Sequence, residues 1–470
     1  MKLYDLKGFE AIEILKGSFG IEWESLRVKN DGQLSLTPHP TVFGDKLKNP
    51  LVTTDFSESQ IEIITPTFNK IDKAYDTFTI LSDIVNNSLP DDEYLWFQSM
   101  PCILPPPNQI PIAKYPKEGK SSQKYREKLA QKYGLKKQMI SGVHFNFSFS
   151  DYLIDKLFEN NIEDISYKEF KNRIYLKISR NYIRYCWLII YLTGSSIGFH
   201  KTYESDKIPL MDKKDNDDGY YSSQGPSFRN GRHGYKNLKA LYPSYDTVEE
   251  FVKDINIFIE NRDLSEAKEL YSQIRLKPKN PDDLLNSLIN DGIEYLEIRT
   301  LDINPFYKCG LVKHDMKFLH LFLIYMLIKE ESDYSNWQIE AKINEENTAE
   351  MGYSDNLRLL KDGKKVKFKD WACDIIEEMY EMCEELNFDK ADLTLNLMYN
   401  RILNKNLTYG QRLLKLISEN GYINTHIQLS KNNKASSRYN LEKIDMSKSE
   451  ELKKYVNIVL SGSKIFKNKE

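Results

Sequence analysis

The sequence predicts an α+β fold, with a large sheet that has one strongly polar face, helices that back the sheet, and a helical C-terminal half. Three observations support this prediction. Four short segments alternate strictly between apolar and polar side chains, capped helical patterns lie between and after them, and the pattern beyond Asn304 is mostly helical. Because the chain shows no internal repeat and no clear linker, we expect residues 1–470 to form one domain, sheet-bearing over 1–306 and mainly helical over 307–470.

The alternating segments carry the strongest signal. They cover residues 21–24, 61–63, 143–149 and 296–299. Successive side chains of a strand point to opposite faces, so the apolar set of each segment should face a core and its Glu, His, Asn or Arg set the other side. Four carboxylates and one imidazole on a single face repel one another unless cations hold them together. We therefore expect this face to bind divalent metal.

Capping signals predict the helices in order. Ser166 opens a long helix that ends near Gly194 and is expected to back the sheet. Capping boxes that start at Thr247 and Ser447 open two more helices. Asn280, followed by proline, starts a short helix just before the fourth alternating segment.

The remaining pattern divides into one loop and further helices. Residues 211–226 are rich in Asp, Lys, Gly and Ser, and are expected to form a long exposed loop that could order over a ligand. Residues 313–330 and 369–387 have helical periodicity.

Composition excludes several classes of partner. The 66 Lys and Arg residues nearly balance 69 Asp and Glu, so the net charge of −3 offers no field for nucleic acid or anionic lipid. Five cysteines without CxxC spacing indicate reduced thiols in a cytoplasmic protein. The N-terminus lacks a signal-peptide core, and the longest apolar runs, residues 186–192 and 318–328, are too short to span a bilayer.

Side chains suited to anionic substrates lie between the strands. Asp55 stands at a strand entrance, seven residues before Glu62, so one metal could bridge the pair. Four arginines lie near tyrosines or carboxylates, and guanidinium groups suit carboxylate and phosphate oxygens. These are Arg126, Arg229, Arg275 and Arg299. The chain has no Walker motif, GxGxxG, HExxH or GxSxG, so a nucleotide would be held through metal-bridged phosphates, and oxygen ligands with one imidazole favour Mg²⁺ or Mn²⁺ over Zn²⁺.

Simpler interpretations exist for each residue taken alone. A single Glu on a strand is more often solvated than a ligand, and a single His such as His144 is more often structural. The arginines could equally be structural ion-pair partners. Five such positions on one face are much harder to explain in this way.

Six motifs match a known family in the same order. They cover residues 20–28, 53–56 with Glu62, 99–102, 125–126, 140–148 and 292–306. Together they resemble the bacterial glutamate–cysteine ligases (γ-glutamylcysteine synthetases), of the type without a fused ATP-grasp domain. The resemblance implies a glutamine synthetase-like curved antiparallel sheet, forming a funnel with Mg²⁺ along its inner face. The chain ends before an ATP-grasp domain could fit, so only the first step of glutathione biosynthesis is expected.

The resemblance also implies roles for individual residues. The metal ligands would be Glu22, Glu24, Asp55, Glu62, His144 and Glu297. Glutamate and the transferred phosphoryl group would be held by Arg126, Arg229 and Arg299, and the incoming cysteine would be enclosed by Tyr125, Tyr235 and Tyr271. Asn146 and Ser148 are expected to contact ATP. Trp23 replaces a basic residue of the best-known relatives, but on the opposite strand face, where it should affect packing only.

The implied reaction is ATP-dependent. ATP would phosphorylate the γ-carboxylate of L-glutamate, and the amine of L-cysteine would displace phosphate to give γ-glutamylcysteine, without a covalent enzyme intermediate. Two alternatives stay open: a ligase of the same fold that uses another amine, and a metal-dependent hydrolase or binding protein that consumes no ATP.

Overall fold

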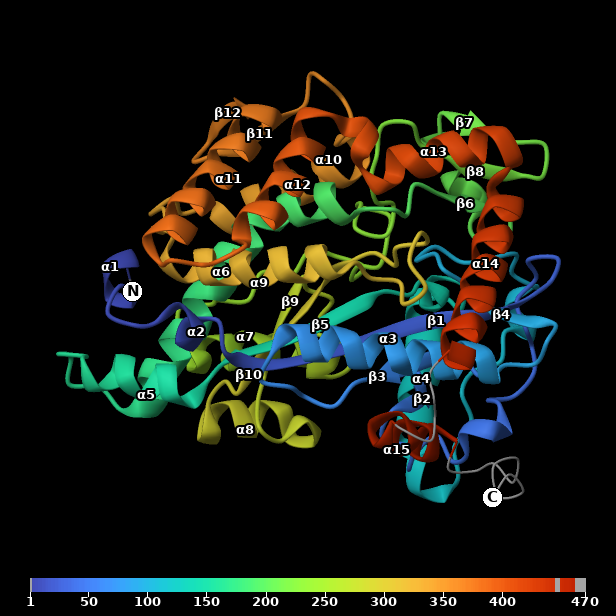
Figure 1. Cartoon of the computed structure of the whole chain (residues 1–470), viewed down its shortest axis with the longest axis horizontal. Helices are drawn as coiled ribbons and strands as arrows, with labels where there is room; N and C mark the ends of the chain where they lie inside the picture. Colours follow the sequence, from blue (N-terminus) through green and yellow to red (C-terminus); the bar gives the residue numbers. More distant parts are fainter. Residues whose placement is uncertain (1, 444–448, 461–470) are drawn as a thin grey trace.

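The four alternating segments lie in strands of one sheet, as the sequence predicted (Figure 1). The structure is a computed structural model that describes residues 2–443 and 449–460. The sheet has seven antiparallel strands in the order β2-β3-β1-β5-β10-β9, with β4 paired to the end of β1. The strands are β1 Gly17–Lys29, β2 Val52–Thr54, β3 Gln60–Ile64, β4 Glu93–Leu95, β5 Val143–Phe149, β9 Ile274–Lys277 and β10 Tyr295–Leu301.

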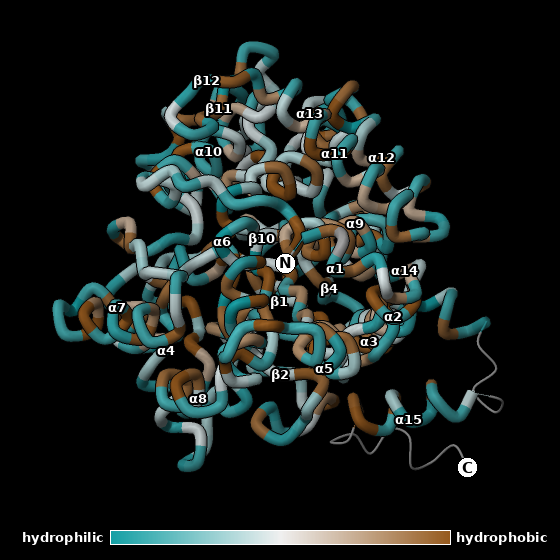
Figure 2. Tube along the Cα trace, turned by 90° about the vertical axis from the view of Figure 1, so that its left-hand side faces the viewer, coloured by the Kyte–Doolittle hydropathy of each residue, from teal (hydrophilic) through white to brown (hydrophobic). Residues whose placement is uncertain are grey.

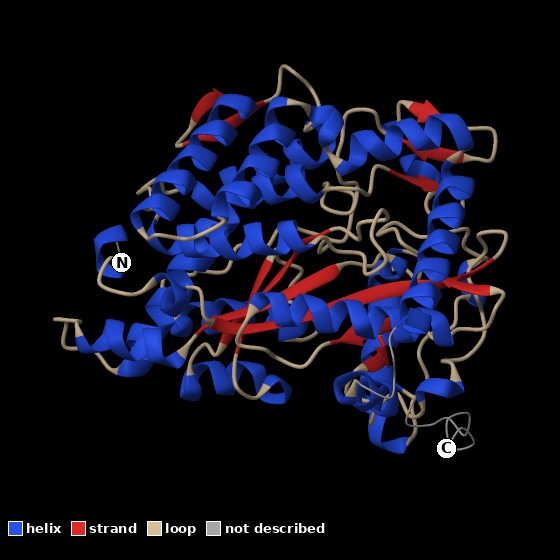
Figure 3. Cartoon of the chain, in the orientation of Figure 1, coloured by secondary structure: helices blue, strands red, loops and turns tan. Residues whose placement is uncertain are grey.

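Helices make up most of the remaining described chain. They are α1 Leu3–Leu6, α2 Ala11–Ile14, α3 Ile71–Ser88, α4 Lys120–Tyr133, α5 Asp151–Glu159, α6 Tyr167–Thr193, α7 Val248–Glu260, α8 Leu284–Asp291, α9 Lys313–Ile328, α10 Trp337–Met351, α11 Phe368–Glu385, α12 Ala391–Leu403, α13 Tyr409–Asn420, α14 Tyr422–Lys443 and α15 Glu450–Val459. Figure 3 shows the long strands as one red group, with α10 to α13 gathered away from them at the top of the view. Within the described ranges, no helix is both long and apolar enough to cross a membrane.

The register of β1 aligns the polar side chains. Glu22 lies opposite His144 of β5, and Glu24 lies opposite Glu62 of β3. Glu297 lies on β10, the next strand beyond β5. Because residues opposite one another in paired strands share a face, the predicted ligands converge on one side of the sheet.

The other face of the sheet forms the core. Helix α3 packs on β1 and β3, α6 packs on β9 and β10, and α9 packs against both helices. Trp23 is fully buried and meets Phe78 of α3 edge to face, with ring centroids 6.0 Å apart, so the predicted packing role of Trp23 is confirmed. In Figure 2 the apolar stretches gather around β1, α6 and α9, while the hydrophilic ones lie toward the periphery.

The predicted helix starts agree with the structure where it describes them. Oγ of Ser166 accepts a hydrogen bond from the backbone of α6, and Oγ1 of Thr247 does the same for α7. Helix α8 follows Asn280 after a short 3-10 turn and is capped at its C-terminus by Gly292. The φ of 83° at Gly292 lies in the left-handed region, which favours glycine. The capping box predicted at Ser447 lies outside the described residues, and α15 begins after Ser449.

Two segments differ from the sequence prediction. The expected loop 211–226 instead contributes two strands to a small sheet, made of β6 Gly198–His200, β7 Lys213–Lys214 and β8 Gly219–Tyr221. Its turn is held by Asp215, which accepts hydrogen bonds from the backbone of Asp217 and Gly219. The helical C-terminal half also contains a hairpin, β11 Arg358–Lys361 and β12 Lys364–Lys367, whose Asp-Gly turn has positive φ at both residues.

Candidate active site

The polar face of the sheet carries an acidic cluster. Glu22 and Glu24 flank His144, with Nδ1 of His144 3.3 Å from Oε2 of Glu22 and Nε2 3.5 Å from Oε1 of Glu24. Glu62 lies opposite Glu24. Asp55 directly follows β2, close enough for its charge to act on both Glu24 and Glu62. The structure thus brings five of the predicted metal ligands into one cluster.

Two carboxylates of this cluster are stabilised in the protonated form. Burial, followed by the charge of Asp55, raises the pKa of Glu24 to about 8. Burial and the neighbouring carboxylates also raise the pKa of Glu62 well above its ordinary 4.5. Nε2 of His144 and Oδ1 of Asn146 are buried without a hydrogen-bond partner. No three Asp, Glu, His or Cys side chains of the described chain are already arranged to hold an ion, but crowded oxygen donors beside an unpartnered imidazole nitrogen fit a divalent cation chemically.

Glu297, the sixth predicted ligand, stands among cations instead. Its carboxylate lies 2.5 Å from Nζ of Lys277, 2.6 Å from Nη1 of Arg299 and 3.6 Å from Nη1 of Arg275. Burial alone would raise the pKa of Glu297, but these three cations hold it well below 4.5. The polar face therefore has an acidic half on β1, β3 and β5 and a basic half on β9 and β10.

Lys277 was not among the residues predicted from the sequence. It lies on β9, where Arg275 and Lys277 alternate with the buried Ile274 and Leu276. This is the same period of two that marked the other strands. The sequence singles out Arg275 but not Lys277, because basic residues, unlike clustered carboxylates, are common on solvated strand faces.

Arg229 joins the two halves from a loop. Its Nη2 donates to the carbonyl of Arg299 at 2.9 Å, and its Nη1 donates to the carbonyl of Thr300 at 3.3 Å. Its guanidinium rests against Gly142, where a Cβ atom would lie only 2.2 Å from Nη2. The backbone N–H of Gly142 in turn donates to Oε2 of Glu24 at 3.2 Å. Gly142 therefore allows the arginine to approach the acidic cluster closely.

Arg126 reaches the acidic half from α4. Its Nε donates to the carbonyl of Asp55, and its Nη2 donates to the carbonyl of Thr54 at 3.3 Å. Its guanidinium lies over the ring of Tyr115, 5.0 Å from the centroid. The residue is thus fixed at the end of β2, beside Asp55.

A cavity of about 300 Å³ opens beside the basic half. Its lining includes Arg229, Arg299 and the predicted tyrosines Tyr235 and Tyr271, whose ring centroids are 4.4 Å apart. The hydroxyl of Tyr235 donates to Oε1 of Gln138 at 3.3 Å. The cavity thus joins charged and aromatic surfaces at one edge of the sheet.

Three further predicted residues lie around this centre. Tyr125 does not line the cavity, but burial and then the neighbouring Tyr271 raise its pKa. Asn146 donates to Oε1 of Glu22 at 2.7 Å and lies opposite Glu297. Ser148 lies farther along β5, beside the hydroxyl of Tyr175.

Comparison with known proteins identifies the family. A family model described as glutamate–cysteine ligase matches residues 6–264 and 256–350. The chain belongs to the glutamate–cysteine ligase family. A glutamate–cysteine ligase from Clostridium acetobutylicum is 33% identical, and the match covers 85% of this chain and 92% of that relative. A glutathione biosynthesis bifunctional protein from Clostridium perfringens is 40% identical over 91% of this chain and 55% of its own length. The chain spans about half the length of such bifunctional relatives.

Two crystal structures share the fold of this glutamate–cysteine ligase family member. A bifunctional glutathione synthetase from Pasteurella multocida superposes with a TM-score of 0.83 at 29% identity, over 96% of this chain and 57% of that chain. A glutamate–cysteine ligase from Francisella tularensis in complex with AMP superposes with a TM-score of 0.82 at 27% identity, over 96% of this chain and 98% of that chain.

Gly142→Ala should lower kcat by at least about 10-fold, because the new Cβ displaces the guanidinium of Arg229 from the polar face. Overpacking should also reduce stability by about 1–3 kcal/mol, so activity is measured well below the melting temperature. Gly8→Ala is the matched control, since a Cβ at Gly8 meets nothing within 4 Å. Wild-type kcat in Gly142→Ala would show that turnover does not depend on this position of Arg229.

Proposed function

We propose that this chain catalyses the ATP-dependent ligation of the γ-carboxylate of L-glutamate to the amine of L-cysteine, the first step of glutathione biosynthesis. The observation that carries the proposal is the division of one sheet face into an acidic half and a basic half beside a tyrosine-lined cavity. The acidic half suits metal ions that hold the phosphates of ATP, and the basic half suits the negative charge of the phosphoryl group during its transfer to glutamate. Membership of the glutamate–cysteine ligase family supports the same reaction.

The acidic side chains are proposed to hold Mg²⁺ or Mn²⁺. The proposed ligands are Glu22, Glu24, Asp55, Glu62, His144 and Glu297. When bound, the metal would neutralise charge on the phosphates of ATP. The raised pKa of Glu24 and the unpartnered Nε2 of His144 support this assignment. Asn146 and Ser148 are proposed to contact ATP, and the orphan Oδ1 of Asn146 supports the first of these.

The arginines are proposed to hold glutamate and the phosphoryl group during transfer. They are Arg126, Arg229 and Arg299, and we add Lys277 because its ammonium group meets Glu297 on the same face. Once the γ-carboxylate is phosphorylated, the amine of cysteine attacks the acyl carbon, a C–N bond forms, the C–O bond to phosphate breaks, and the amine loses a proton. Negative charge on the carbonyl oxygen at this stage is stabilised by Arg299.

The acceptor cysteine is proposed to bind between Tyr125, Tyr235 and Tyr271. Tyr235→Ala should raise the KM for cysteine at least about 10-fold while changing the KM values for ATP and glutamate much less. The reason is that, of the three substrates, the ring of Tyr235 is proposed to contact only cysteine. Steady-state kinetics with each substrate varied in turn measures this. Tyr152→Ala, on a half-exposed side chain away from the cavity, is the matched control. An unchanged cysteine KM would remove Tyr235 from the acceptor site.

ADP release with glutamate and ATP, with and without cysteine, tests the function. We expect release to depend on cysteine and on Mg²⁺ or Mn²⁺, and to stop with a chelator, because the proposed ligands are mainly hard oxygen donors. Equal rates with alanine or another amine would favour a different γ-glutamyl ligase. Metal binding without ATP consumption would favour a hydrolase or a binding protein, and full turnover without metal would contradict the proposed acidic site.

We further propose a cytoplasmic location, one domain over residues 1–470, and small-molecule substrates as the partners. The five cysteines, Cys102, Cys186, Cys309, Cys373 and Cys383, are unpaired in the structure, which is typical of a reducing compartment. The balanced net charge of −3 supports the absence of a nucleic-acid partner.

A further inference from the structure

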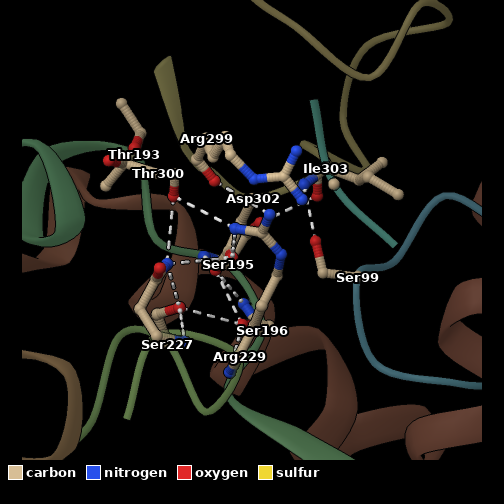
Figure 4. A network of polar contacts seen from close by, with 12 residues as sticks. Ser99, Thr193, Ser195, Ser196, Ser227, Arg229, Arg299, Thr300, Asp302 and Ile303 are labelled. Carbon is tan, nitrogen blue, oxygen red and sulfur yellow. Dashed lines mark hydrogen bonds and ion pairs between the residues drawn. The ribbon is translucent and has the colours of Figure 1, made fainter. Parts of the chain in front are cut away.

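We propose that Asp302, a buried residue that does not line the substrate cavity, is a positioning residue that holds Arg229 in the candidate active site (Figure 4). The inference rests on the proposed role of Arg229. Asp302 directly follows β10, and its side chain lies in a network that includes Ser195 and Ser196. It would act through other side chains, without touching substrate.

Asp302 first fixes the segment that follows α6. Its Oδ2 accepts hydrogen bonds from the backbone N–H groups of Ser195 and Ser196 at 3.0 Å each, and from Oγ of Ser196 at 2.7 Å. Three donors on one carboxylate oxygen satisfy a buried charge and leave it little freedom to move. The end of β10 and the end of α6 are therefore tied at this point.

Two contacts lead from this tie to Arg229. Oγ of Ser196, which donates to Asp302, accepts the backbone N–H of Arg229 at 3.3 Å. Oδ1 of Asp302 lies 3.8 Å from Nη1 of Arg229 and accepts from Nδ2 of Asn230 at 3.4 Å. Asn230 is also held by Oγ of Ser227, which lies 3.1 Å from Oγ of Ser196. Both the backbone and the charge of Arg229 are thus oriented by one carboxylate.

The guanidinium of Arg229 has little room to move. Its guanidinium lies between the carbonyls of Arg299 and Thr300 on one side and Gly142 on the other. If Asp302 lost its charge, the guanidinium would lose the carboxylate that lies 3.8 Å from its Nη1. It would then be held there by the neutral carbonyls of Arg299 and Thr300, so its orientation would be less firmly fixed.

Asp302→Asn should lower kcat about 10- to 100-fold at saturating glutamate, cysteine and ATP, as is typical for the loss of a partner that orients an active group. Asp315→Asn is the matched control. Asp315 is an equally buried carboxylate in α9 that accepts from Nη1 of Arg401 at 2.7 Å and from the hydroxyl of Tyr409 at 2.8 Å, away from the polar face. The Asp315→Asn variant should have a lower melting temperature but an unchanged kcat.

Two adjacent serines give a second comparison that does not depend on the charge change. Ser196→Ala removes the hydroxyl that links Asp302 to Arg229, whereas Ser195→Ala removes one that donates to the carbonyl of Ile303 at 2.8 Å. Only Ser196→Ala should reduce kcat. If Asp302→Asn does not fold, this pair decides the proposal by itself.

A double-mutant cycle separates positioning from general structure. In an Arg229→Ala background, Asp302→Asn should lower the melting temperature but cause no further loss of kcat, since the group that it positions is absent. If Arg229→Ala keeps wild-type kcat, the proposed role of Arg229 fails. If Arg229→Ala is impaired but Asp302→Asn and Ser196→Ala keep wild-type kcat, or if the losses of kcat multiply, the positioning role of Asp302 is wrong.

Discussion

Glu297→Gln should lower kcat by about 100- to 1000-fold, the largest catalytic effect that we expect from one substitution. Glu297 pairs with Lys277, Arg275 and Arg299 and so holds these three cations together. A neutral glutamine keeps the size of the side chain but leaves three cations without their anion, and it removes a proposed metal ligand. The measurement is kcat from ADP release with all substrates saturating.

Glu294→Gln provides the control for this change. Glu294 precedes the same strand but is half exposed, and it pairs with Lys171 on the surface. It should keep wild-type kcat, because exposed pairs contribute about 0–1 kcal/mol to stability and this one lies outside the polar face. A Glu297→Gln enzyme with wild-type kcat would contradict the whole assignment of the polar face.

Arg27→Met should lower the free energy of unfolding by about 3–5 kcal/mol, the largest stability effect that we expect. Arg27 lies on β1 with only 1% of its side chain exposed, and its Nη1 donates to Oε2 of Glu93 at 2.6 Å. Its Nη2 donates to the carbonyls of Thr37, Pro38 and Glu58. Methionine fills the space but leaves Glu93 without its strongest partner. Denaturant unfolding measures the change.

A second substitution and a pH scan test whether the ion pair with Glu93 accounts for this loss of stability. Adding Glu93→Leu to Arg27→Met should recover much of the stability, and the exposed Arg438→Met should change it by less than about 1 kcal/mol. Burial alone would raise the pKa of Glu93, but Arg27, Ser35 and Lys29 bring it down to about 2. Its contribution to stability is therefore present above pH 4.5 and is lost as the pH falls toward 2, so wild type and Arg27→Met should converge over that range. A constant difference would mean that another interaction of Arg27 dominates.

The sheet and its acidic half could be predicted because both follow from local alternation. Glu22 and Glu24 alternate with the apolar Ile21 and Trp23, and this alternation is visible within four residues of the sequence. The register that places Glu24 opposite Glu62 could not be read from the sequence, yet the hydrophobic pattern left few other solutions.

Other features depend on contacts between distant segments. The sequence gives no sign that Glu297 is surrounded by cations. Lys277 and Arg275 lie on β9, and the pairing of β9 with β10 cannot be inferred from local sequence patterns. Asp302 lies inside a recognised motif, but its partners Ser195 and Ser196 lie more than a hundred residues earlier. Two parts of the loop expected over residues 211–226 form strands, because tertiary contacts such as that of Asp215 with the backbone of Tyr422 override its loop-like composition.

The strand order also has a consequence for synthesis of the protein. Glu22 and His144 are 122 residues apart, and β10 completes the sheet only at Leu301. At roughly 5–20 residues per second, a ribosome would need roughly 8–30 seconds to pass from the end of β5 to the end of β10. Throughout that time the edge of β5 has no β10 to pair with, and an unpaired apolar strand invites association with other chains. The yield of folded protein in cells should therefore depend on growth temperature and chaperone supply, even though the finished fold places β5 between β1 and β10.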